Sequence, residues 1–180
     1  MHALRSIILS AVAFFCVSTF YAVTASADDP LLPDVKFLLT WGSEGTEPGQ
    51  FNIPIGIAIN ADDEIFICDH YNNRVQRFDA DGKLLAHFNV MNNPGGCTID
   101  ADGLLYITHF PTSKTSKEPT PDRVTIYNQT GEFVREFGSS GSDEGQLNWP
   151  GGIIVHPNGK VYVADQTNHR VQVFDKKGIF

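Results

Sequence analysis

The sequence predicts an all-β protein: a partial β-propeller with about three four-stranded blades. Three observations predict this fold. The sequence repeats itself at a spacing typical of propeller blades, and each copy divides into four short strands separated by turn residues. The second strand of each copy is apolar on both of its sides. No apolar period of 3.6 residues, which would indicate a helix, occurs after residue 27.

Internal repetition gives the positions of the blades. Residues 41–82 align without a gap onto residues 137–178, and a weaker middle copy lies between them. The middle copy carries an insertion at residues 110–121. We expect blades at about residues 41–88, 89–137 and 138–180. The structural positions that recur between copies are Gly56, Gly96 and Gly152, Asp69 and Asp165, and Arg74, Arg123 and Arg170.

Each copy contains four expected strands, which in the first copy are residues 57–60, 64–68, 74–79 and 84–88. Asp-Gly, Thr-Gly and Lys-Gly pairs ending at Gly82, Gly131 and Gly178 mark the last hairpin turn of each copy. The second strands, at residues 65–68, 104–107 and 161–164, are apolar at every position. Such a strand must be covered on both faces, and sheets stacked face to face around an axis provide that cover. A β-sandwich would instead leave an outer face and an alternating pattern.

The first 27 residues resemble a secretory signal peptide. Arg5 lies before an apolar run at residues 7–23, and Ala25-Ser26-Ala27 has the small residues of a cleavage site. The alternative is a retained membrane anchor, but the run is at the lower limit of spanning length. We therefore expect cleavage before Asp28 and a mature domain at residues 28–180. That domain would be secreted or periplasmic, with no membrane insertion after the signal is removed.

Charge and cysteine content restrict the partners and the chemistry. The chain has a formal net charge of −8, and Arg5 is the one charged side chain among residues 1–27. An acidic domain repels phosphate backbones, so nucleic acid is not expected as a partner. Cys68 and Cys97 remain after removal of the signal. In an oxidising compartment they could form a disulfide, or both could be small core residues. Asn128 begins a glycosylation sequon that matters only in a eukaryotic source.

Two motifs resemble the signature of the NHL-repeat family of β-propellers. The first is Gly-Gln-x-Asn-x-Pro-x-Gly, which ends at Gly56 and again at Gly152. The second is Asp-x-x-Asn-x-Arg-Val-Gln-x-Phe, which starts at Asp69 and again at Asp165. The resemblance covers residues 37–180. It implies a propeller that usually has six blades, and a role in recognition.

A chain with three copies cannot close a six-bladed ring. Residues 35–40 resemble a fourth strand without its three partners, and Phe180 falls where the last strand of the third copy should begin. Each open end would then expose an apolar sheet face. Either the chain is part of a longer product, or two chains self-associate into one ring. In the second case residues 35–40 of one chain would complete the last blade of its partner.

The candidate binding face consists of the connectors between blades and the loops between strands two and three. We expect it to bind a protein, peptide or glycan. The insertion occurs in one blade only, which is typical either of a recognition loop or of a tolerated surface loop. The Asp69/Arg74 and Asp165/Arg170 pairs recur, so they are interpreted as structural, and His109 departs from the pattern by replacing the Asp. The candidate ligand-binding residues are His70, Tyr71, Asn72, His109, Lys114, Lys117, Gln166, Asn168 and His169.

An enzyme is the alternative interpretation. The peptidyl-hydroxyglycine amidating lyases share this type of propeller and hold zinc through His residues, one of them in a Pro-His segment entering an inner strand. The matching positions here are Ile55, Gly95 and Gly151, which cannot bind zinc. No catalytic residue, metal site or cofactor is therefore expected, although blades outside this sequence could carry metal ligands. The serines at 139, 140 and 142 lie in a Gly-rich connector and do not form a nucleophile elbow.

Overall fold

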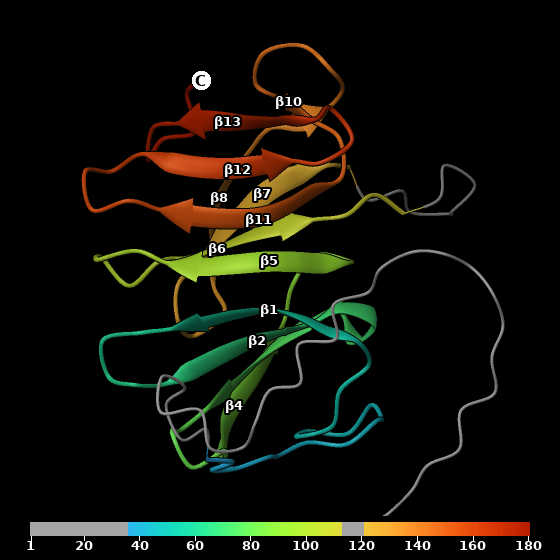
Figure 1. Cartoon of the computed structure of the whole chain (residues 1–180), viewed down its shortest axis with the longest axis vertical. Helices are drawn as coiled ribbons and strands as arrows, with labels where there is room; N and C mark the ends of the chain where they lie inside the picture. The colour runs from blue at the N-terminus through green and yellow to red at the C-terminus, as the bar shows by residue number, and fades with distance from the viewer. Residues whose placement is uncertain (1–35, 113–120) are drawn as a thin grey trace, which may run out of the picture. The chain divides into compact units, whose positions relative to one another are not determined.

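The structure is a computed structural model, and it describes residues 36–112 and 121–180. These residues form three antiparallel sheets and one short parallel pair of strands. Residues 38–180 form one compact unit, to which the description below applies. Within each sheet the strands follow one another in chain order (Figure 1). This confirms the predicted all-β, propeller-type fold. The predicted signal peptide at residues 1–27 lies outside the described residues.

Each sheet is one blade. Blade 1 contains β1 (Pro54–Ile59), β2 (Ile65–Asp69), β3 (Arg74–Phe78) and β4 (Leu84–Asn89). Blade 2 contains β5 (Pro94–Ile99), β6 (Leu105–His109), β7 (Arg123–Tyr127) and β8 (Phe133–Phe137). Blade 3 contains β11 (Pro150–Val155), β12 (Val161–Asp165) and β13 (Arg170–Phe174). A 3₁₀ turn, η1 (His70–Asn72), follows β2, and the connector into blade 3 holds a parallel pair, β9 (Ser139–Ser140) and β10 (Gln146–Leu147).

The first strand of blade 1 begins earlier than predicted. The sequence analysis placed the start of this strand at residue 57, but β1 begins at Pro54. The pairing of β1 with β2 shifts between Pro54 and Ile57. The same irregularity occurs in β5 and β11. Proline is tolerated as the first residue of a strand. The bulge that follows it interrupts the two-residue alternation of side chains, so the sequence pattern does not show that the strand starts at the proline.

The cores lie between blades and confirm that the second strand of blade 2 is covered on both faces. All five residues of β6 are buried. Leu105 and Ile107 pack toward blade 1, whereas Tyr106 packs toward blade 3. The core between blades 1 and 2 contains Phe66, Cys68, Val75, Cys97, Leu105, Ile107 and Tyr127. The core between blades 2 and 3 contains Tyr106, Val124, Ile126, Phe137, Leu147, Val161, Val163 and Phe174.

Inner strands of neighbouring blades approach so closely that only glycine fits between them. β5 lies beside both β1 and β11 (Figure 1). A Cβ atom on Gly56 would lie 2.4 Å from the carbonyl oxygen of Gly95, and one on Gly96 would lie 2.5 Å from that of Gly151. For Gly152, at the equivalent position in blade 3, no described atom lies within 4 Å. The recurring glycines therefore set the spacing of the blades.

Trp41 occupies the place of a residue from a preceding blade. The rings of Phe88 and Phe137 each cover the glycine of the last hairpin turn in the following blade, Gly131 and Gly178, and Trp41 covers Gly82 in the same way. Trp41 also contacts Phe78, with ring centroids 6.0 Å apart. Residues 38–40, by contrast, form no strand in the described structure.

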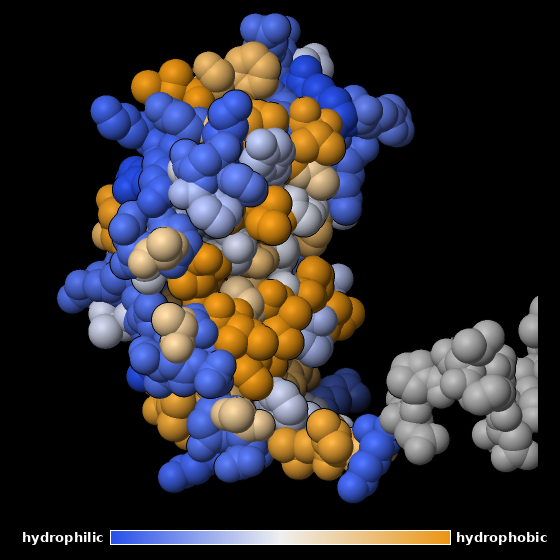
Figure 2. Space-filling model, turned by 60° about the vertical axis from the view of Figure 1, so that its left-hand side comes forward, coloured by the Kyte–Doolittle hydropathy of each residue, from blue (hydrophilic) through white to orange (hydrophobic). Residues whose placement is uncertain are grey.

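Both end faces of the stack are apolar and exposed. On blade 1 the exposed side chains are Ile55, Ile57 and Ile59, and on blade 3 they are Ile154, Val171 and Val173. Figure 2 shows apolar side chains gathered at the height of β1 and β2. Burial in β12 alternates, unlike in β6, because no described blade covers its second face. No helix in the described residues is long and apolar enough to cross a membrane.

Candidate binding face

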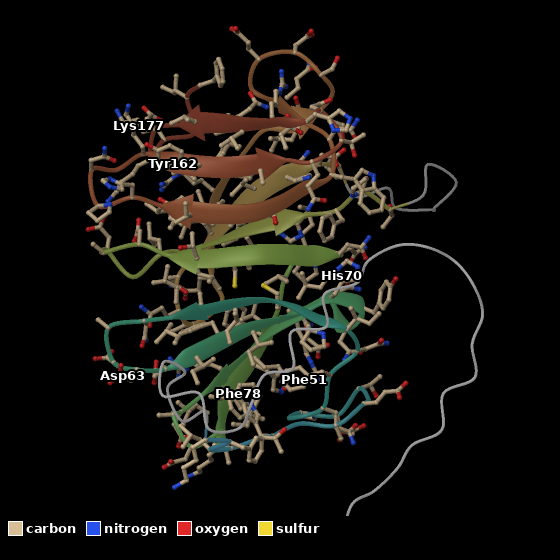
Figure 3. All side chains as sticks on the ribbon, in the orientation of Figure 1. Phe51, Asp63, His70, Phe78, Tyr162 and Lys177 are labelled. Carbon is tan, nitrogen blue, oxygen red and sulfur yellow. The ribbon has the colours of Figure 1, made fainter. Side chains whose placement is uncertain are left out.

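The loops between the second and third strands lie at one end of the strands. The hairpin turns between the first and second strands lie at the other end. Figure 3 places His70, which follows β2, and Asp63, which precedes it, at opposite ends of blade 1. The connectors that enter each blade reach the same end as His70, because the backbone N–H of Tyr71 donates to the carbonyl oxygen of Asn52 at 3.1 Å. We call this end the loop face.

A buried carboxylate organises the loop face of blade 1. Asp69 has no exposed surface, and it accepts hydrogen bonds from the N–H of Asn52 at 2.7 Å, from Asn72 at 2.8 Å and from Nε of Arg74 at 2.8 Å. The guanidinium of Arg74 also donates to the carbonyl oxygens of Thr46, Glu47 and Gln50. The pair thus ties the connector to the sheet, as the structural interpretation of the repeat expected.

Blade 3 repeats this network. Asp165 accepts from the N–H of Asn148 at 2.7 Å, from Asn168 at 2.9 Å, from Nε of Arg170 at 2.8 Å and from Gln172 at 2.9 Å. Burial alone would raise the pKa of Asp165, but these hydrogen bonds outweigh it and hold the pKa below its usual value. Because Asn72 and Asn168 are both used within these networks, neither amide is free to serve mainly as a ligand contact.

His109 replaces the aspartate in blade 2 and is fully buried. Its Nδ1–H donates to the carbonyl oxygen of Asn92 at 2.9 Å, and its Nε2 accepts from the hydroxyl of Thr125 at 2.7 Å. Burial is the main reason that the pKa of His109 falls to about 4, so the ring is neutral near pH 7. A buried ring with both nitrogens occupied has a structural role, and the structure does not place His109 on the surface of the loop face.

Asp122 gives the connector between blades 2 and 3 an additional anchor. Its carboxylate accepts from the N–H of Trp149 at 2.7 Å and from the hydroxyl of Ser140 at 2.8 Å. The next residue, Arg123, pairs with Glu136 and makes no contact with His109 like that of Arg74 with Asp69. Arg123 therefore matches the repeat in sequence but not in its ion pair.

An aromatic row crosses the loop face over all three blades. His70 and Tyr71 come from blade 1, Phe110 from the start of the insertion in blade 2, and Trp149 from the connector into blade 3. Neighbouring ring centroids are separated by 4.6 Å (His70 to Tyr71), 5.6 Å (His70 to Phe110) and 5.6 Å (Phe110 to Trp149). Tyr71 is 56% exposed and Trp149 49% exposed, whereas His70 is buried beneath them and donates from Nδ1 to the carbonyl oxygen of Pro94.

Backbone strain accompanies the exposed apolar side chains on this face. Ile53, Asn93 and Trp149 occupy the same position in the three connectors, just before a proline, and have φ values of 57°, 54° and 55°. Left-handed backbone is rare for side chains such as Ile and Trp and costs about 1–3 kcal/mol. The loops after β2, β6 and β12 hold it in place through hydrogen bonds to the carbonyl oxygens of these three residues. Strain of this kind clusters at binding sites.

The structure separates the sequence-predicted residues into groups. His70 and Tyr71 lie in the aromatic row, while Gln166 and His169 are exposed on the same end of blade 3. Asn72, His109 and Asn168 belong to structural networks, and Lys114 and Lys117 lie outside the described residues. Sequence reasoning missed Trp149 and Ile53. The signal that could have found them is a large apolar residue between the recurring Asn and Pro of the two strong motifs.

Among the described residues, no group of three or more His, Cys, Asp or Glu side chains is placed to hold a metal ion. Ile55, Gly95 and Gly151 lie at the starts of the inner strands, as predicted, and carry no ligand atoms in their side chains.

Comparison with known proteins identifies the repeat. The family model for the NHL repeat matches residues 51–78 and 147–174, which are the connector and first three strands of blades 1 and 3. The chain belongs to the NHL-repeat family. This NHL-repeat chain is 33% identical over 145 residues to Protein brain tumor of Drosophila melanogaster, an alignment that covers 77% of the chain. It is 31% identical over 141 residues to the B-box type zinc finger protein ncl-1 of Caenorhabditis elegans, again over 77% of the chain.

The NHL-repeat chain spans only a small part of these relatives, 13% of Protein brain tumor and 16% of ncl-1. Among solved structures, it resembles the hydrazine synthase of Kuenenia stuttgartiensis with a TM-score of 0.52 and 22% identity. That match covers 69% of this chain and 33% of the synthase chain. At this identity the likeness concerns the fold alone.

Proposed function

We propose that the protein is an exported NHL-repeat module that binds a protein or peptide partner through the aromatic row and the loops around it. The observation that carries this proposal is the continuous row of His70, Tyr71, Phe110 and Trp149 across three blades. Exposed Tyr and Trp side chains supply large contact areas at little entropic cost and dominate the energy of many protein interfaces.

The surroundings of the row support recognition rather than catalysis. The non-repeated insertion begins at Phe110, inside the row, and ends beside Asp122, which anchors the N–H of Trp149. The two described ends of this one-blade insertion thus lie at the row or next to its anchor, and its sequence adds Lys114 and Lys117 to an otherwise acidic chain. Aromatic residues are enriched at the centre of binding interfaces.

The test uses peptides as the probe. The 180-residue chain is immobilised and used to select binders from a displayed library of random short peptides. We expect Tyr71→Ala and Trp149→Ala each to weaken the selected peptides by at least about tenfold (~1.4 kcal/mol), because each removes one exposed ring of the row. Phe133→Ala is the matched control, since Phe133 is a similarly exposed ring on β8, in the outermost strand of blade 2.

Two outcomes would oppose the proposal. Equal loss of binding in Phe133→Ala and in the row variants would show that the row has no special role. The second outcome is that no peptide is selected, but the chain binds immobilised glycans and this binding needs Tyr71 and Trp149. The ligand would then be a glycan, because aromatic rings also stack on sugar rings. Loss of binding on replacing residues 113–120 by a short Gly-Ser linker would extend the site to the insertion.

Export and ring closure complete the proposal. Residues 1–27 have the composition of a signal peptide, so amino-terminal sequencing of protein recovered from the periplasm or medium should begin at Asp28. The exposed apolar faces of β1 and blade 3 favour cover by further blades of the same kind, to make six in total. These blades could come from a second copy or from a longer form of the same chain, and light scattering distinguishes the two. A second copy would give a particle with twice the mass of one chain, whereas a longer chain would give the mass of a single chain.

A further inference from the structure

We propose that Cys68 and Cys97 form a disulfide that links blade 1 to blade 2. This inference rests on the proposed export of the protein, because disulfides form in oxidising compartments and thiols persist in reducing ones. The linked residues belong to different sheets, so the bond would add a covalent link between two blades that otherwise adhere through packing and through hydrogen bonds such as that of His70 with Pro94.

The two thiols lie in contact across the interface between the blades. Cys68 is in β2 and Cys97 is in β5, and both side chains are buried in the same apolar core. Cys97 is the largest cause of the raised pKa of the Cys68 thiol. Gly56 brings the two inner strands together at the same level, since a Cβ atom on Gly56 would lie 3.1 Å from Sγ of Cys97. The inner strands of the two blades are therefore already close around these side chains.

The repeat shows that neither position requires cysteine for the fold. At the next interface Thr108 stands in the place of Cys68, and Ile153 stands in the place of Cys97. Thr108 reaches across that interface and donates to the carbonyl oxygen of Gly151 at 2.8 Å. The position in the second strand thus faces the inner strand of the following blade. Only between blades 1 and 2 do both facing positions carry sulfur among the described residues.

The bond forms by thiol–disulfide exchange with a small disulfide such as oxidised glutathione. One cysteine thiolate attacks the small disulfide and expels one small thiol, which leaves a mixed disulfide on the protein. The second cysteine thiolate then attacks the protein sulfur, expels the second small thiol and closes the bond. Overall, two protein thiols lose two protons and two electrons, and one small disulfide gains them and becomes two small thiols.

Burial determines when this exchange can occur. The hydrogen bond from Cys97 and the loss of water around Cys68 raise the pKa of the Cys68 thiol, so the folded chain holds little thiolate there. Exchange should therefore precede the docking of blade 2 on blade 1, or require its transient opening. We expect the folded, reduced protein to oxidise much more slowly than the unfolded chain.

The experiment uses the 180-residue chain with Cys16→Ser, which leaves two cysteines. The unfolded, reduced protein is refolded in a glutathione redox buffer, digested without reduction and analysed by mass spectrometry. We expect a linked peptide pair that contains Cys68 and Cys97, and no thiol that reacts with maleimide after denaturation. Two reactive thiols per chain, or only glutathione adducts, would overturn the proposal.

A stability measurement provides the second readout. The oxidised protein should melt on the order of 10 °C above the same protein treated with a reductant. In the control variant Cys68→Ala/Cys97→Ala the reductant should not change the melting temperature. If the oxidised and reduced proteins melt together, the bond does not fasten the blades. Refolding in a defined buffer does not depend on export, so a failure here is distinguishable from a failure of the proposed location, which amino-terminal sequencing tests.

Discussion

The carboxylate of Asp69 accepts a hydrogen bond from Nε of Arg74 at 2.8 Å inside blade 1, and the same two residue types meet at the same distance in blade 3. Both carboxylates are fully buried, and both guanidinium groups also hold the carbonyl oxygens of the preceding connector. The most conspicuous charges in the sequence therefore hold the loops in place, and the binding function falls to the rings that these loops carry.

Removing Arg74 should strongly destabilise the fold. Arg74→Ala leaves the buried Asp69 without its cation, a change that typically costs about 3–5 kcal/mol. Arg170→Ala should cost less, because the side chain of Arg170 is 31% exposed where that of Arg74 is 7% exposed. Urea denaturation measures both, with the exposed Lys177→Ala as a control that should change the unfolding free energy by less than about 0.5 kcal/mol. Similar effects for Arg74→Ala and Lys177→Ala would contradict the structural role.

Stability should depend on pH through His109. In the unfolded chain a histidine with a pKa of 6.5 binds a proton below that pH, whereas the folded protein admits one only near pH 4. The stabilisation is therefore complete above pH 6.5 and is lost as the pH falls toward 4, by about 3 kcal/mol. In His109→Gln the urea midpoint should change less with pH across this window than in the native chain. In His87→Gln, at an exposed position, the change of the midpoint with pH should stay the same. An identical slope in both variants would show that His109 is not the source.

Adding one methyl group at Gly56 should disrupt blade packing. In Gly56→Ala the new Cβ would meet the backbone of Gly95, which cannot move without separating the inner strands, so we expect a loss of about 2 kcal/mol or more. Gly152→Ala is the matched control, because the same repeat position has open space there. It should be neutral, or stabilising by a few tenths of a kcal/mol. Thermal unfolding of the two variants side by side gives the comparison, and equal losses would argue against the close approach of β1 and β5.

Relief of backbone strain at Ile53 should cost little stability. Ile53→Gly removes a side chain that is 53% exposed and a φ of 57° that isoleucine rarely adopts. We expect the unfolding free energy to stay within about 1 kcal/mol of that of the native chain, or to rise. Ile59→Gly, a similarly exposed isoleucine in β1 without positive φ, should lose about 1 kcal/mol. If Ile53→Gly loses more than Ile59→Gly, Ile53 contributes packing that outweighs its strain.

The blades were predictable because repetition and apolar content act locally. Copies that place apolar residues at every position of the second strand require cover on both faces, and β6 has that cover. The Asp69/Arg74 and Asp165/Arg170 pairs were predicted as structural because they recur, and both form. The start of β1 was not predictable, because the bulge after Pro54 interrupts the period of the strand.

The aromatic row was only partly predictable, because its rings come from three blades whose arrangement in space the sequence does not state. Tyr71 and His70 were identified from their loop, but Trp149 lies in a connector whose left-handed backbone the sequence does not indicate. His109 was singled out for its departure from the repeat. Its role follows from burial and from its contacts with Asn92 and Thr125, which no local pattern reveals.

Hydrogen–deuterium exchange of the protein with a selected peptide tests the central claim most directly. If the aromatic row is the binding surface, the peptide should slow exchange at residues 70–73, 110–112 and 148–149, which come from all three blades. Slowed exchange at residues 61–64, 101–104 and 158–160, the hairpin turns at the opposite end of the blades, with no change along the row, would contradict it.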